Sequence, residues 1–144
     1  GFQSMVNTLR QTTPEYEKNG MDVREYIYDM PRVMAAADLV LCRAGASTVS
    51  ELTYLHKPTI FVPSPFVTNN HQYKNAKLVS DAGGAVLLEE GHFDAKQLLC
   101  EVRRILSSES EQIKMSHAME KLAMPDALNI IAEQVLSLAH TDFQ

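Results

Sequence analysis

The sequence has few of the residues and patterns that mark several protein classes. Only two of its 144 residues are cysteine, Cys42 and Cys100; they imply no disulfide framework, and we expect them in a buried strand and a buried helix. The five histidines lack metal-ligand spacing, so we expect neither a metal nor another cofactor. Acidic residues outnumber basic ones by 18 to 13, and no basic stripe exists to neutralise the phosphates of a nucleic acid.

Long hydrophobic runs are also absent. No apolar stretch approaches the roughly 20 residues that cross a bilayer, and no signal peptide is visible, so a cytoplasmic location is expected. The hydrophobic content of 45% suits one globular domain over residues 1–144. We find no internal repeat, low-complexity tract or linker that would divide it.

The chain opens inside a predicted helix. Apolar residues at helical spacing predict an amphipathic helix to about Gln11: Phe2, Met5, Val6 and Leu9. A parallel sheet ordinarily starts with a strand that feeds its first helix. We therefore expect that the first strand lies upstream and that the chain is a fragment, truncated at its N-terminal side.

Short β-favouring runs alternate with helical patterns along the rest of the chain. Strands are predicted at 23–27, 39–42, 59–62 and 85–88. Helices are predicted at about 31–37, 48–55, 71–82, 94–106, 109–124 and 126–139, with glycines at 83–84 as the left-handed stop of the helix at 71–82. This alternation predicts an α/β fold, a Rossmann-like parallel sheet with helices on both faces, whose last helices pack back over the sheet.

Residues 37–52 are the centre of this pattern. An apolar strand ends at Cys42, a turn of small residues follows, and an amphipathic helix begins. Ligands of open parallel sheets bind outside the carboxyl ends of the strands, and a helix start offers N–H groups that suit phosphate. A purely structural interpretation is also open, because Thr48 and Glu51 fit a capping box with Thr48 as N-cap.

Three predicted loops, at 28–31, 43–47 and 63–72, leave the carboxyl ends of successive strands and would share one crevice. The first offers backbone groups beside Ile27 and Met30, which suit a flat base. The second suits phosphate, and Glu51 is placed to accept hydrogen bonds from a ribose diol. The third ends in neutral groups that can read sugar hydroxyls: Asn69, Asn70, His71 and Gln72.

Several of these segments together resemble the carboxyl-terminal half of one enzyme family. They are residues 43–51 (RAGASTVSE), Pro58, the PSP at 63–65, residues 69–76 (NNHQYKNA), residues 26–30 (YIYDM) and residues 125–127 (PDA). The family is MurG, whose members transfer N-acetylglucosamine from UDP-N-acetylglucosamine to undecaprenyl-pyrophosphoryl-muramoyl-pentapeptide, converting lipid I to lipid II in peptidoglycan synthesis.

The resemblance implies that this chain is the donor-binding half of a glycosyltransferase-B fold. Ile27 would meet the uracil through its backbone, with Met30 nearby, and the helix start would face the diphosphate. Glu51 would bind the ribose, and Gln72 with His71 would hold the sugar. The implied donor-binding set is Ile27, Met30, Ala46, Ser47, Thr48, Val49, Ser50, Glu51, His71 and Gln72.

No catalytic residue is expected in this chain. The resemblance places the general base, the acceptor site and the membrane contact in the other half, so the whole enzyme would be peripheral to the inner face of the bacterial plasma membrane. His71 is a weaker candidate for the base, because a base must reach the acceptor proton.

Three other interpretations stay open at this stage. The chain could be a separate donor-binding subunit of a two-chain UDP-N-acetylglucosamine transferase. It could be a non-enzymatic α/β regulatory domain, although Asp38 precedes its strand and Asp29 lies in a turn, so neither sits where a phosphorylated aspartate belongs. A UDP-sugar epimerase shares the architecture, but is not expected to combine the 45–51 and 71–76 motifs.

Overall fold

The structure is a computed structural model that describes residues 2–15 and 17–141. The chain divides into two compact units, residues 1–32 and 33–144. In the first unit, α1 (Phe2–Thr12) is the predicted amphipathic helix, with Val6 buried. The predicted strand at 23–27 is wrong: this segment is irregular, and Arg24 donates hydrogen bonds to Asp22 rather than to a neighbouring strand. The short helix α2 (Met30–Ala36) follows.

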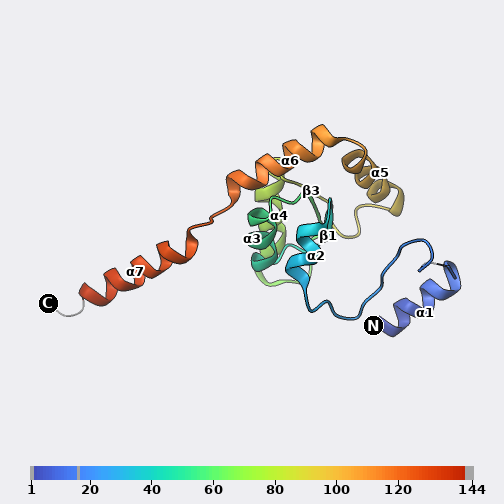
Figure 1. The fold of residues 1–144 in the computed structure, drawn as a ribbon, viewed down its shortest axis with the longest axis horizontal. Coiled ribbons are helices and arrows are strands. Elements are labelled where there is room, and N and C mark those ends of the chain that lie inside the picture. Colours follow the sequence, from blue (N-terminus) through green and yellow to red (C-terminus); the bar gives the residue numbers. More distant parts are fainter. Residues whose placement is uncertain (1, 16, 142–144) are drawn as a thin grey trace. The chain divides into compact units, whose positions relative to one another are not determined.

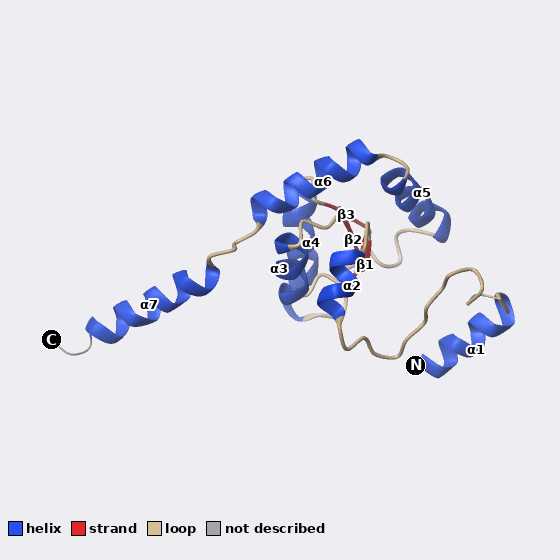
Figure 2. Cartoon of the chain, in the orientation of Figure 1, coloured by secondary structure: helices blue, strands red, loops and turns tan. Residues whose placement is uncertain are grey.

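The described residues of the second unit hold a three-stranded parallel sheet, shown in red in Figure 2. Its strands are β1 (Val40–Cys42), β2 (Thr59–Phe61) and β3 (Ala85–Leu87), in the order β1-β2-β3. In register, Val40 pairs with Thr59 and Thr59 with Ala85. The other three strand predictions and the parallel α/β class are confirmed, because each strand returns to the sheet through a helical crossover.

Helices cover both faces of the sheet, and the strand residues alternate between two cores (Figure 1). One core joins Phe61 of β2 to Leu52, Val79 and Met119 from three helices. The other joins Ile60, the next residue along the strand, to Ile105 and Met115. Every residue of β2 is buried, whereas Leu41 of β1 is half exposed. The sheet is therefore anchored at β2.

The helices agree with the predicted pattern to within a few residues. They are α3 (Ala46–Tyr54), the 3₁₀ turn η1 (Thr68–Asn70), α4 (His71–Asp81), α5 (Ala95–Leu106), α6 (Glu109–Leu122) and α7 (Ala127–Thr141). Helix α6 packs over the sheet as expected. Helix α7 does not, because its apolar side chains are exposed: Leu128, Ile131, Val135 and Leu138.

The helix ends show why the boundaries fall where they do. Gly83, at φ +86, ends α4 in a left-handed conformation, and the N–H groups of Gly83 and Gly84 bond to the carbonyls of Ser80 and Val79. This is the predicted glycine stop, with both hydrogen bonds of a Schellman motif. Helix α5 starts with a capping box between Asp94 and Gln97.

The two cysteines lie in different environments. Cys42 is partly buried in β1, and desolvation raises the pKa of its thiol to about 11. Cys100 is exposed, so its predicted burial is wrong. It lies two residues beyond Leu98 on α5, and two residues turn a helix by about 200°, which directs its side chain away from the core face. Among the described residues, no helix is long and apolar enough to cross a membrane.

Candidate functional site

The turn from β1 into α3 differs from the capping box that the sequence suggested. Gly45 is the N-cap, with extended backbone at φ −64 and ψ 150 and no side-chain cap. The Thr48 N-cap is therefore wrong: Thr48 is already the third residue of the helix. The small residues Ala44 and Gly45 end the strand quickly, so the helix starts three residues earlier than a cap at Thr48 would place it.

The start of α3 presents free backbone donors. The first backbone bond of the helix runs from Val49 N–H to the Gly45 carbonyl at 2.9 Å. Within the described part of the chain, the N–H groups of Ala46, Ser47 and Thr48 have no acceptor. Such groups, with the positive end of the helix dipole, favour an anion.

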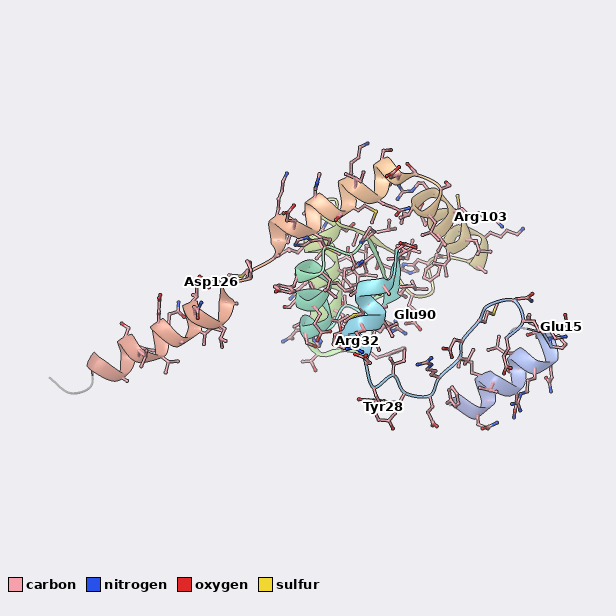
Figure 3. The ribbon with its side chains drawn as sticks, in the orientation of Figure 1. Glu15, Tyr28, Arg32, Glu90, Arg103 and Asp126 are labelled. Carbon is pink, nitrogen blue, oxygen red and sulfur yellow. The ribbon has the colours of Figure 1, made fainter. Side chains whose placement is uncertain are left out.

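Arg43 links the carboxyl ends of all three strands. From the residue after β1, its Nη1 donates to the Val62 carbonyl at 2.9 Å and to Glu90 Oε2 at 2.5 Å. Val62 directly follows β2, and Glu90, labelled in Figure 3, lies just beyond β3. Both partners of the ion pair are about half exposed. Arg43 therefore fixes this edge of the sheet.

The loop after β2 is held by side chains near the start of α4. The Ser64 N–H donates to Gln72 Oε1 at 2.9 Å, so the Gln72 carbonyl oxygen is engaged and its amide N–H₂ remains for a ligand. His71 Nδ1 lies 2.9 Å from the Thr68 carbonyl. As the hydrogen donor of this pair, Nδ1 leaves Nε2 free.

Two consecutive residues of this loop, Asn69 and Asn70, are left-handed, with φ of 55 and 52. Asparagine tolerates this conformation better than most residues. The loop therefore holds its two asparagines, His71 and Gln72 in a short, locally hydrogen-bonded segment.

Asn75 ties α4 to the turn after β1. Its Nδ2 donates to the Ala44 carbonyl at 3.1 Å, and Ala44 is fully buried. Asn75 lies one turn after Gln72, so one face of α4 holds the loops that follow both β1 and β2.

The eight predicted site residues of the second unit lie beside one depression and at the starts of two helices. Val49, Ser50 and Glu51 line a largely apolar depression of about 450 Å³ with Leu78 and Met124. Another depression, of about 250 Å³, lies beside the loop after β2 and is lined by Pro63, Ser64, Pro65, Asn70, Tyr73, Glu89, Glu90 and His92. Ala46, Ser47 and Thr48 lie at the start of α3, and His71 and Gln72 at the start of α4. Ile27 and Met30 belong to the unit of residues 1–32, and their proximity to the others stays a prediction.

Sequence reasoning missed three residues at this edge. Arg43 and Asn75 stand inside the motifs quoted above but received no role. Glu90 follows β3, and the three predicted loops did not include that one. The rule that carboxyl ends of parallel strands meet at one edge gives the signal that could have included the loop at 89–91. No cluster of histidine, cysteine and acidic residues suited to a metal occurs among the residues that the structure describes.

Comparison with known protein families identifies the family of this chain. Residues 3–131 match the model of the glycosyltransferase family 28 C-terminal domain. The chain belongs to this family. Its glycosyltransferase fold accounts for the parallel sheet, for the short turn into α3 and for the position of the polar loops at the carboxyl edge.

Two curated relatives of this chain have the same enzyme name. Both are UDP-N-acetylglucosamine–N-acetylmuramyl-(pentapeptide) pyrophosphoryl-undecaprenol N-acetylglucosamine transferases. The protein of Anaeromyxobacter sp. (strain K) is 44% identical over 117 residues, which cover 81% of this chain and 30% of the relative. That of Bacillus cytotoxicus is 44% identical over 116 residues, covering 81% and 32%. The chain thus spans about a third of the length of these relatives.

Solved structures agree with the family and the fold. The crystal structure of Acinetobacter baumannii MurG matches with a TM-score of 0.73 and 28% identity, over 81% of this chain and 33% of that one. The predicted resemblance to MurG is therefore confirmed. The spinosyn rhamnosyltransferase SpnG, complexed with thymidine diphosphate, matches with a TM-score of 0.54 and 23% identity, over 83% and 34%, and supports the fold alone.

Proposed function

We propose that residues 1–144 form a single domain that binds UDP-N-acetylglucosamine for a hexosyltransferase of peptidoglycan synthesis. The acceptor would be the lipid-linked muramoyl-pentapeptide, bound by a further part of the enzyme that also contacts the inner face of the plasma membrane. The observation that carries the proposal is the family match, together with the free N–H groups of α3 at the carboxyl edge of the sheet.

Each part of the donor has a matching group in this proposal. The N–H groups of Ala46, Ser47 and Thr48 face the diphosphate, where donors positioned in advance stabilise the negative charge of the departing UDP. Glu51, exposed on the next turn of α3, accepts hydrogen bonds from the ribose hydroxyls, with Val49 and Ser50 beside it. The amide of Gln72, with His71 next to it, reads the sugar. Ile27 and Met30 contact the uracil.

The chain supplies binding and leaving-group stabilisation, but no general base. His71 Nδ1 donates to the Thr68 carbonyl and leaves Nε2 free, but His71 lies in the donor-binding part, and a general base must reach the proton of the acceptor hydroxyl. Deprotonation of the acceptor hydroxyl therefore falls to the acceptor-binding part. No metal or other cofactor is part of the proposed reaction.

The test is an NMR titration of the ¹⁵N-labelled chain, which detects weak binding residue by residue. UDP-N-acetylglucosamine should shift the amide signals of Ala46, Ser47 and Thr48 and the side-chain amide of Gln72. UDP should shift the helix signals and leave the Gln72 side chain nearly unchanged, because it lacks the sugar. GDP is the control for the base. An equal response to GDP, or no response at α3, would contradict the proposal.

A further inference from the structure

Two amide side chains of α4 hold the two loops that end β1 and β2. Gln72 accepts a hydrogen bond from Ser64, and Asn75 donates one to the Ala44 carbonyl. Residues three apart lie on the same face of a helix, so both bonds come from one side of α4. A single helix face thus sets the positions of the loop after β2 and of the turn into α3.

The Ala44 carbonyl belongs to the peptide that precedes the N-cap of α3. A hydrogen bond to this oxygen fixes the plane of the Ala44–Gly45 peptide, and Gly45 then sets the direction in which the helix begins. On the other side of the turn, the Arg43 side chain is fixed by the Val62 carbonyl and Glu90. The turn is therefore held on one side by Asn75 of α4 and on the other by the side chain of Arg43.

We propose that Asn75 is a positioning residue for the anion at the start of α3. It acts through the Ala44 carbonyl, which aligns the free N–H groups of Ala46, Ser47 and Thr48 on one point. The inference rests on the proposed function, which places the donor diphosphate at that point. Donors aligned before binding lose no entropy on meeting the anion, so the alignment increases the affinity for the diphosphate.

A purely structural role of Asn75 makes a different prediction. If Asn75 only satisfied the buried Ala44 carbonyl, its loss would lower the stability of the fold and weaken the binding of all ligands alike. A positioning role weakens the ligands that carry a diphosphate and spares those that lack one. The ratio of the affinities for UDP and for uridine separates the two roles.

The test compares Asn75→Leu with the unmodified chain. Leucine keeps the approximate shape of asparagine and removes the amide donor without adding charge. The matched control is Asn129→Leu, because Asn129 is an exposed asparagine of α7 whose amide bonds locally to Asp126. NMR titrations measure the affinities for UDP and uridine, and thermal unfolding checks that each variant is folded. If Asn75→Leu does not fold, Asn75→Ala removes the same donor and is measured instead.

We expect Asn75→Leu to weaken UDP binding about five- to tenfold, which is the order of one to two hydrogen bonds. Uridine binding should weaken by less than about twofold. Asn129→Leu should change neither affinity. An equal loss for UDP and uridine would overturn the positioning role, and so would unchanged UDP binding.

A second measurement needs no ligand. In the free chain, ¹⁵N relaxation should show larger motion of residues 44–48 in the Asn75 variant than in the unmodified chain. If the unmodified chain failed to bind UDP, the proposed function would be wrong. Unchanged relaxation at 44–48 would then overturn the positioning of the turn as well, whereas a local increase would retain it.

Discussion

Arg43 and Glu90 form an ion pair across the carboxyl edge of the sheet, with Arg43 Nη1 2.5 Å from Glu90 Oε2. The same nitrogen donates to the Val62 carbonyl, so one side chain joins the residues that follow three strands. Because both charged groups are about half exposed, we expect the attraction between their charges to contribute less to stability than the hydrogen bonds of Arg43 do.

The first prediction separates these two contributions. Glu90→Gln keeps an acceptor and removes the charge, so the free energy of unfolding should fall by less than about 1 kcal/mol. Arg43→Ala removes both hydrogen bonds and should cost about 1–2 kcal/mol. Urea unfolding measures both values, with Lys77→Ala, which breaks the exposed pair with Asp81, as control. Equal losses for the Glu90 and Arg43 variants would show that the bond to Val62 contributes nothing.

The second prediction concerns Glu51 and the ribose. Charge-assisted hydrogen bonds are worth roughly 1.5–3 kcal/mol, so Glu51→Ala should weaken UDP about tenfold or more. The affinity for uridine should fall by the same factor, because uridine carries the same ribose. The Asn75 variant, in contrast, should bind uridine almost as well as the unmodified chain does. Because Gly45 is the N-cap of α3, no capping role of Glu51 complicates the result.

Glu51→Gln is the sharper variant, and the exposed Glu120→Gln of α6 is its control. NMR titration with UDP and uridine gives the affinities. If Glu51→Gln binds UDP with full affinity, the carboxylate of Glu51 does not bind the ribose.

The third prediction is that residues 1–144 alone do not transfer sugar. A missing general base typically costs about 10²–10⁴-fold, and the loss of proximity to the acceptor can add ~7–11 kcal/mol to the barrier. Incubation with UDP-N-acetylglucosamine and lipid-linked acceptor should give no product above background, as measured by chromatography of labelled lipid. Adding the acceptor-binding part of a relative, in trans or by fusion, should restore transfer. Transfer by the chain alone would make His71 the first residue to mutate.

The fourth prediction concerns the two thiols. Burial raises the pKa of Cys42 from 9.0 to about 11, so its reactive thiolate is scarce at pH 8. At that pH, Cys100 should react with iodoacetamide and Cys42 should not, as mass spectrometry of peptides would show. Since the folded state holds the Cys42 proton more tightly than the unfolded state, stability should fall as pH rises from about 9 to about 11. Cys42→Ala should remove the part of that dependence that Cys42 contributes.

The fifth prediction concerns Gly84, where α4, β3 and α6 meet. A Cβ at this buried position would lie 3.0 Å from Met119 Sδ and 3.2 Å from Val79 Cγ1. Overpacking of this kind costs about 1–3 kcal/mol, so Gly84→Ala should lower the melting temperature. Gly83→Ala tests backbone strain instead of overpacking. Its φ of +86 is unfavourable for any side chain, although the nearest atom to an added Cβ is 3.9 Å away. Unchanged melting in Gly84→Ala would show that Met119 moves aside freely.

The strands and helices of the second unit were predictable because each pattern has a core to face. Ile60 and Phe61 point to opposite cores, and the apolar spacing of α5 and α6 follows from packing on the sheet. The segment at 23–27 has the same alternating pattern but no strand beside it among the described residues, and a strand exists only through its hydrogen-bonded neighbours. Local pattern cannot supply that partner.

The candidate site was predictable in part for a similar reason. The turn into α3 and the polar loop before α4 follow from local composition. The links from Arg43 to Glu90 and from Asn75 to Ala44 join residues 47 and 31 positions apart, and only the register of the sheet brings them together. The predicted cap of α3 was wrong because Thr48 and Glu51 fit a common local motif, whereas the helix starts earlier, with Gly45 as its N-cap.

The burial of every residue of β2 has a consequence for local unfolding at the carboxyl edge of the sheet. β2 is the strand to which both described neighbours bond, and each reaches it through a helical crossover. Local fluctuations that release β2 must break both cores at once, so its amide protons should exchange with solvent only through global unfolding. The loops that follow β1, β2 and β3 share that edge, and they can become neighbours only once the long chain closures of the parallel sheet have been made. Under the proposed function, recognition of the donor thus requires the completed sheet, and no smaller folded part of this unit is expected to acquire it first.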